Sequence, residues 1–88
     1  MKTIYTSKYS SDLGELTIAE FESKICLCDW SFRKMRLAID NRIKSYFDAH
    51  YEEAETELIN EAKLQLNEYF NKSRKIFDIP IILAGTTF

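Results

Sequence analysis

The stretch that decides the fold is Glu57–Asn71, with the sequence ELINEAKLQLNEYFN. On a helical wheel of 3.6 residues per turn, its apolar side chains fall within one arc of about 120°. The members of this arc are Leu58, Ile59, Ala62, Leu66, Tyr69 and Phe70. Thr56 stands at the N-cap position, and Leu64 lies outside the arc. The pattern predicts an amphipathic helix that buries one face in a core.

The segment after this helix changes from helical to extended character. It is rich in β-branched residues and contains the single proline of the chain, Pro80. Because proline cannot donate a backbone hydrogen bond, we expect Ile81–Leu83 to be a short strand with Pro80 either at its start or on an edge. The chain then stops on an apolar aromatic residue, Phe88, which we interpret as a cut through a longer protein.

Three extended segments are predicted in the first third of the chain. Thr3–Tyr9 is rich in β-branched and aromatic residues, Glu15–Phe21 alternates, and Lys24–Phe32 follows a polar break. Ser10–Gly14 is predicted to be a turn in which Asp12 bonds its own backbone. The short links between these segments favour an antiparallel meander.

The middle of the chain has a weaker pattern. Arg33–Phe47 is predicted to be a helix, and its inner face is expected to carry Met35, Ile39, Ile43 and Tyr46. Asp48–Ala54 is acidic and ambiguous, and Ala49–Tyr51 is open to interpretation as a short added strand. The predicted fold class is α+β, with one antiparallel sheet of three to four strands packed by one long and one shorter helix.

Length and composition indicate a single globular domain. A chain of 88 residues can form one domain that buries roughly 60–65% of its unfolded surface. Its 45% hydrophobic and 30% charged residues exclude disorder as the main interpretation. The net charge of −2 argues against a nucleic-acid-binding surface based on charge alone. No apolar run reaches the ~20 residues that span a bilayer and no signal peptide opens the chain, so no membrane partner is expected.

The order of several short motifs resembles the N-terminal domain of the O6-methylguanine-DNA methyltransferases. Gln65–Lys72 is similar to the QL-EYF helix of that family, Phe77–Ile81 to its F-x-(I/L)-P strand, and Gly85–Phe88 to its G-T-x-F junction. Ser11–Leu16 is similar to its S-P-L-G-x-L turn, with aspartate where proline is usual, and Ile25–Trp30 stands in the place of its third strand. The resemblance implies that residues 1–88 form the ribonuclease-H-like N-terminal domain of a longer transferase.

The resemblance also implies a function in DNA repair. Members of the family flip an O6-alkylguanine and move its alkyl group irreversibly to their own cysteine. The Pro-Cys-His-Arg acceptor motif and the helix-turn-helix of the family do not occur in these 88 residues. We therefore expect a non-catalytic domain with no catalytic residue, cofactor or metal ligand. Its expected partners are the C-terminal catalytic domain of the same polypeptide, docked on the surface around Gly85–Phe88 and Leu64, and DNA through that domain. The alternative is a free-standing α+β interaction module without enzymatic activity.

Cys26 and Cys28 are the residues with the most obvious chemistry. Residues two apart on a strand share a face, and apolar neighbours raise the pKa of a thiol. We therefore expect two partly buried, metal-free structural thiols, which suit the reducing cytoplasm. A zinc site completed by His50 would have only three ligands and a spacing between the cysteines that is too short. His50 is accordingly expected to have no function.

Two sets of charged residues complete the candidates. A local basic patch offers possible phosphate contacts, although nearby acids favour an ordinary solvated helix face. Its members are Arg33, Lys34, Arg36, Arg42 and Lys44. Four aspartates raise the question of a two-metal nuclease, but nothing in their spacing brings them together. They are Asp12, Asp29, Asp40 and Asp48.

Overall fold

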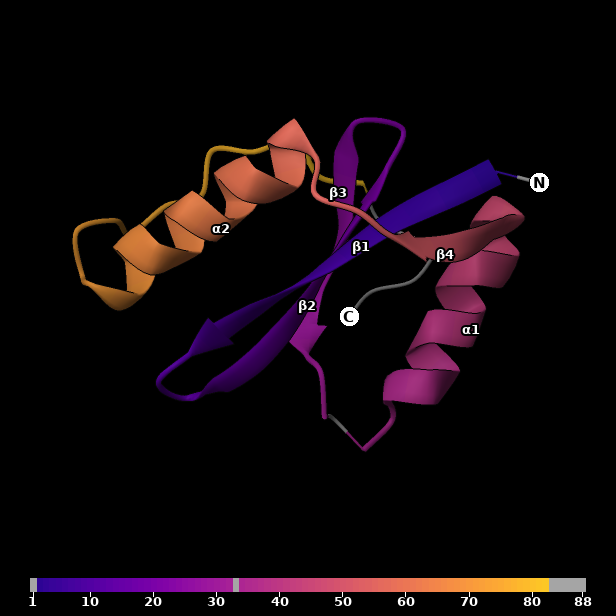
Figure 1. The fold of residues 1–88 in the computed structure, drawn as a ribbon, viewed down its shortest axis with the longest axis horizontal. Helices are drawn as coiled ribbons and strands as arrows, with labels where there is room; N and C mark the ends of the chain where they lie inside the picture. The colour runs from indigo at the N-terminus through magenta and orange to yellow at the C-terminus, as the bar shows by residue number, and fades with distance from the viewer. Residues whose placement is uncertain (1, 33, 83–88) are drawn as a thin grey trace.

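A computed structural model describes residues 2–32 and 34–82, which form one four-stranded sheet and two helices (Figure 1). The strands are β1 (Lys2–Ser11), β2 (Gly14–Phe21), β3 (Lys24–Trp30) and β4 (Ala49–Glu53), and the helices are α1 (Arg36–Phe47) and α2 (Glu57–Phe70). The strand order across the sheet is β3-β2-β1-β4. The predicted α+β class is confirmed.

Two tight turns join the first three strands into the predicted antiparallel meander. At the first turn, the Ser11 hydroxyl donates to the carbonyl of Gly14 at 2.8 Å, and its oxygen accepts from the Leu13 N–H at 3.2 Å. Gly14 has a φ of +140°, which residues with a side chain rarely adopt. Ser11, and not the predicted Asp12, therefore bonds the backbone of this turn.

The fourth strand makes the sheet mixed. β4 runs parallel to β1, from the pair Lys2–Ala49 to the pair Thr6–Glu53. α1 lies between β3 and β4 in the chain and provides the long crossover that a parallel neighbour requires. The prediction of an antiparallel sheet thus holds for three strands and is wrong for the fourth. The reason is that β4 pairs with β1, which is distant in the sequence, and not with a neighbour joined by a hairpin turn.

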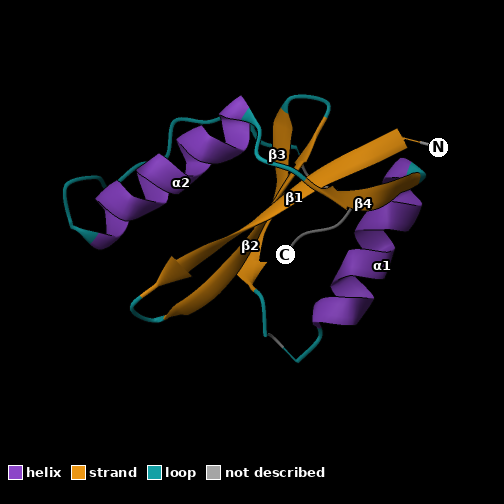
Figure 2. Cartoon of the chain, in the orientation of Figure 1, coloured by secondary structure: helices purple, strands orange, loops and turns teal. Residues whose placement is uncertain are grey.

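The two helices cover opposite faces of the sheet, as Figures 1 and 2 show. On the α1 face, a cluster of buried residues consists of Ile4, Ala19, Phe21, Cys26, Leu27, Ile43 and Ala49. On the α2 face, a second cluster consists of Leu16, Ile18, Ile25, Ile59, Ala62 and Leu66. Each face of the sheet therefore has its own apolar core.

α2 follows the predicted wheel with one exception on its apolar side. Thr56 caps the helix, because its Oγ1 accepts from the Ile59 N–H at 3.0 Å, and its hydroxyl donates to the Glu20 carboxylate on β2. The inner face is buried as predicted at Ile59, Ala62 and Leu66. Tyr69 is 46% exposed, so its placement in the core is wrong.

α1 begins later than predicted and packs through a different face. It starts at Arg36 without a side-chain cap. Ile39 and Ile43 face the sheet as expected, but this face of the helix continues to Phe47. The centroid of the Phe47 ring lies 4.1 Å from that of the Phe21 ring. A spacing of four residues between Ile39, Ile43 and Phe47 keeps these side chains on one side of the helix. The predicted Met35 and Tyr46 are each 58% exposed.

Residues 73–82, here called the strap, return along α2 to the free side of β3. The Ile25 N–H donates to the carbonyl of Pro80 at 2.8 Å, and the Ile82 N–H donates to the carbonyl of Ile25 at 3.0 Å. These bonds make a single parallel bridge between Ile25 and Ile81. The predicted strand is thus reduced to one bridge in the described residues. Leu83 and the predicted docking surface at Gly85–Phe88 lie outside them.

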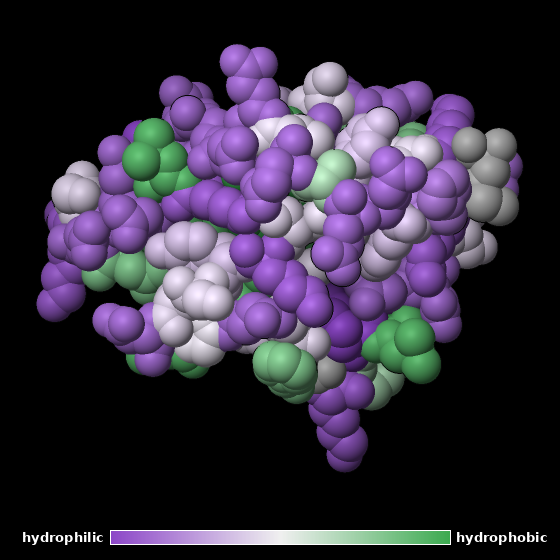
Figure 3. Space-filling model, in the orientation of Figure 1, coloured by the Kyte–Doolittle hydropathy of each residue, from purple (hydrophilic) through white to green (hydrophobic). Residues whose placement is uncertain are grey.

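The visible face of the molecule is mostly hydrophilic, with separate hydrophobic patches over α2 and near the start of α1 (Figure 3). The exposed apolar residues of the two helices include Leu64, which is 52% exposed on α2, and Leu37, which is 73% exposed on α1. In the part of the chain that the structure describes, neither helix has the length and apolar character of a membrane span.

Candidate functional site

An apolar groove of about 410 Å³ lies between β3, α2 and the strap. Its lining residues are Ile25, Cys26, Leu27, Cys28 and Asp29 of β3, Ala62 and Leu66 of α2, and Phe77, Ile79, Ile81 and Ile82 of the strap. Cys28 and Asp29 give this mostly aliphatic and aromatic wall a thiol and a carboxylate. The groove is the candidate site because it brings together three elements and one exposed thiol.

A β-bulge turns the two cysteines to different faces of the sheet. The register between β2 and β3 shifts between Ala19 and Glu20, so Cys26 is an extra residue on β3. Cys26 is 4% exposed and belongs to the cluster under α1. Cys28 pairs with Ile18, on the α2 side, and is exposed at the groove. The expectation of two partly buried thiols on one face is therefore wrong for Cys28.

Neither thiol has the surroundings of a nucleophile. Burial raises the pKa of Cys26 to about 12. Desolvation, and to a smaller degree the charge of Asp29, raises the pKa of Cys28. Because the thiolate is the reactive form, both side chains stay in the unreactive state at neutral pH. The single histidine, His50, lies on β4 at the opposite edge of the sheet, with its Nε2 3.5 Å from Thr3 Oγ1.

Two of the four candidate aspartates, Asp29 and Asp40, meet at an arginine. Arg36 Nη1 lies 3.5 Å from Asp29 Oδ2, and Arg36 Nε lies 3.3 Å from Asp40 Oδ1. The Tyr51 hydroxyl donates to Asp40 Oδ1 at 2.8 Å, and burial together with this bond raises the pKa of Tyr51. The guanidinium thus fills the space where a cation would bind two carboxylates. Across residues 2–32 and 34–82, no three His, Cys, Asp or Glu side chains are grouped so that they could hold a metal ion.

Two residues of the predicted basic patch make contacts within the domain. Arg36 takes part in the ion pairs just described, and Lys44 Nζ lies 5.0 Å from the centre of the Tyr51 ring. Lys34 and Arg42 are exposed, and Arg33 lies outside the described residues. A phosphate contact by this patch stays a prediction.

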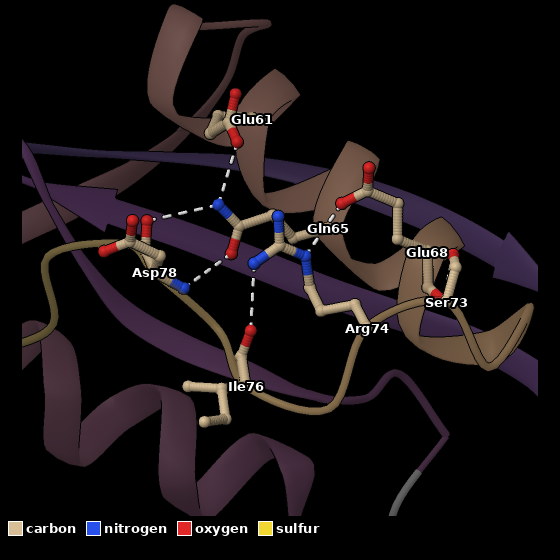
Figure 4. A network of polar contacts seen from close by, with 7 residues as sticks. All are labelled: Glu61, Gln65, Glu68, Ser73, Arg74, Ile76 and Asp78. Atoms are coloured by element: carbon tan, nitrogen blue, oxygen red, sulfur yellow. Dashed lines mark hydrogen bonds and ion pairs between the residues drawn. The ribbon is translucent and has the colours of Figure 1, made fainter.

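A buried glutamine fixes the strap against α2 (Figure 4). Gln65 is 2% exposed, and its Nε2 donates to Glu61 Oε2 at 2.8 Å and to the carbonyl of Asp78 at 3.1 Å. The Asp78 N–H donates to Gln65 Oε1 at 2.8 Å. Gln65 was not among the predicted core residues. The signal for it is its position seven residues after Leu58, which places it inside the apolar arc of α2.

A second contact holds the beginning of the strap. Arg74 Nε donates to Glu68 Oε1 at 2.7 Å, and Arg74 Nη1 donates to the carbonyl of Ile76 at 2.9 Å. The backbone N–H and the hydroxyl of Ser73 both donate to the carbonyl of Glu68, at 2.9 and 3.1 Å. These polar contacts attach the strap to α2 together with the packing of Ile79 against the α2 core.

The fold is that of a ribonuclease-H-like α+β domain, with a mixed sheet between two helices. In comparisons with known proteins, the ribonuclease-like domain of 6-O-methylguanine DNA methyltransferase matches residues 4–83. The constitutive methylated-DNA--protein-cysteine methyltransferase of Bacillus subtilis (strain 168) is 34% identical over 87 residues, which cover 96% of this chain and 47% of that protein. No solved structure matches the chain.

The chain belongs to the family of the ribonuclease-like domain of 6-O-methylguanine DNA methyltransferases. This result confirms the resemblance found in the sequence. The chain spans about half the length of the curated relative that it matches.

Proposed function

We propose that this chain is the non-catalytic N-terminal domain of a DNA-repair methyltransferase. The full-length form would move alkyl groups from O6-alkylguanine in DNA to its own cysteine. The observation that carries this proposal is the match of residues 4–83 to the ribonuclease-like domain of that enzyme family. The name of the Bacillus subtilis relative describes transfer from methylated DNA to a protein cysteine, and this chain aligns with 47% of that protein.

The surroundings of the two cysteines support a non-catalytic role. Alkyl transfer needs a thiolate that attacks the alkyl carbon, so that an S–C bond forms while the bond from carbon to guanine O6 breaks. The pKa values of Cys26 and Cys28 are both raised, which keeps the thiols protonated. His50 lies at the far edge of the sheet and is not placed to take a proton from either thiol. We therefore expect the acceptor cysteine in another part of the polypeptide.

The proposed role of the domain is to support and position a C-terminal catalytic half. Its two cores lie on opposite faces of one sheet, which makes it a scaffold with its own packing. DNA would be bound through the catalytic half, since the net charge of this chain is −2. We place the protein in the cytoplasm, because free cysteines suit a reducing compartment.

The alternative is a free-standing interaction module, which the two separate cores of this chain also support. The coding sequence beyond Phe88 distinguishes the two. A continuation that contains Pro-Cys-His-Arg, and a purified longer product that removes methyl groups from O6-methylguanine DNA, are the results we expect. A stop codon at this point, or a longer product without transfer activity, would contradict the proposed function.

A further inference from the structure

The groove between β3, α2 and the strap has the chemistry of a surface for apolar side chains. Asp29 is its charged wall residue, and this carboxylate is already engaged. Asp29 Oδ1 accepts from the Trp30 N–H at 2.8 Å, and Asp29 Oδ2 lies 3.5 Å from Arg36 Nη1. A charged side chain buried on this wall would lose its hydration without gaining an available counter-charge. An apolar side chain would gain free energy by leaving water.

Exposed apolar side chains extend the groove outward. Ile81 is 60% exposed and Phe77 is 37% exposed, and both line the groove. Tyr69 is 46% exposed, and its ring lies 5.3 Å from that of Phe77. Apolar patches of this kind on a folded domain mark interaction surfaces more often than single exposed residues do.

The edge of the sheet is also accessible beside the groove. β3 is an edge strand, and in the described residues the strap pairs with it only through Ile25. An edge strand with unpaired backbone groups is normally covered by another segment. The backbone groups at the edge of β3 and the apolar groove are therefore next to each other, and one bound segment could contact both.

The groove is formed in advance of any contact. Its strap wall is held by the bonds between Gln65 and Asp78 and by the ion pair between Arg74 and Glu68 (Figure 4), and by the packing of Ile79 against the α2 core. A wall that is already fixed lowers the ordering cost of binding.

We propose that this groove is the docking surface for the catalytic half of the same polypeptide, which inserts apolar side chains between β3 and the strap. The inference rests on the proposed function and adds the surface of contact. Ile82 lines the groove and is hydrogen-bonded to Ile25, so a polypeptide that continues past the strap starts at this wall. Such a tether keeps the catalytic half at a high effective concentration here. Leu37, by contrast, lies on α1, on the opposite face of the sheet.

Cys28 provides a reporter inside the groove. The experiment measures the rate at which iodoacetamide alkylates Cys28 at an alkaline pH, where a fraction of this thiol is ionised. The modified peptide is quantified by mass spectrometry. The rate in the 88-residue chain is compared with the rate in the full polypeptide encoded by its gene. We expect alkylation in the full polypeptide to be slower by about tenfold or more, a factor that corresponds to about 1.4 kcal/mol in favour of the covered state.

Two variants locate the protecting surface. Ile81→Asp places a charge on the rim of the groove and should restore fast alkylation of Cys28 in the full polypeptide. Leu37→Asp, the matched control on α1, should leave Cys28 protected. Circular dichroism of both variants in the 88-residue chain verifies that the domain still folds.

Each contrary outcome has its own meaning. Equal alkylation rates in a full polypeptide that repairs DNA would overturn the docking surface and leave the proposed function standing. A gene that ends with this chain would overturn both. Protection that appears in the 88-residue chain alone as its concentration rises would assign the groove to a second copy and would also overturn the inference.

Discussion

The substitution Gln65→Met tests how the strap is held. It removes the amide but keeps the length of the side chain, and three hydrogen bonds to Glu61 and Asp78 disappear. At about 0.5–1.5 kcal/mol for each bond, the gross loss is about 1.5–4.5 kcal/mol. Glu61 and Asp78 are exposed, so water replaces the lost partner, and the methionine gains apolar burial. We therefore expect the free energy of unfolding to fall by about 1–3 kcal/mol.

Two measurements check this expectation. Urea unfolding followed by circular dichroism gives the free energy of unfolding, with Asn67→Met at an exposed position of α2 as the control. Hydrogen exchange of the Ile82 amide, which donates to the carbonyl of Ile25, reports opening of the strap. We expect this amide to exchange about tenfold faster, or more, in Gln65→Met. An unchanged urea midpoint together with unchanged exchange at Ile82 would refute the role of Gln65.

Three further predictions concern stability. Leu66→Ala removes a side chain that is 7% exposed in the α2 core and should cost about 2–4 kcal/mol in urea unfolding, toward the lower end because Leu66 borders the groove. Lys63→Ala, which breaks an exposed pair with Glu55, should change little, and equal losses would show that the helix phase is wrong. Thr56→Ala should cost about 0.5–2 kcal/mol through the lost cap, and a stability equal to wild type would contradict the cap. Burial raises the pKa of Cys26 to about 12 from the ordinary 9.0, so the unfolded chain releases this proton first. Stability should therefore be full below pH 9.0 and decline as the pH approaches about 12, and a rise over that interval would contradict the burial of Cys26.

Local patterns predicted most of the elements. β-branched and aromatic residues located the first strand, alternation located the second, and a polar break marked the start of the third. The apolar arc together with Thr56 located α2. All of these signals come from neighbouring residues. The inner face of α1 was predicted less well. Its true members, Ile39, Ile43 and Phe47, are selected by contact with the sheet, notably by the stacking of Phe47 on Phe21.

Features that depend on distant parts of the chain could not be predicted. β4 is a weakly patterned acidic segment, and it is a strand because its backbone pairs with β1. The bulge at Cys26 separates the two thiols, although alternation along a strand places them on one face. The groove exists because the strap returns to β3 through one bridge at Ile25, and no local pattern describes that return.

This domain is predicted not to accept alkyl groups itself. The most direct measurement incubates the 88-residue chain with DNA that carries radiolabelled O6-methylguanine, beside the Bacillus subtilis relative as the positive control. Label transferred to each cysteine is then counted by peptide mapping. We predict stoichiometric label on the relative and none above background on Cys26 or Cys28, because burial and desolvation keep both thiols protonated. Stoichiometric label on either cysteine of this chain would contradict the claim.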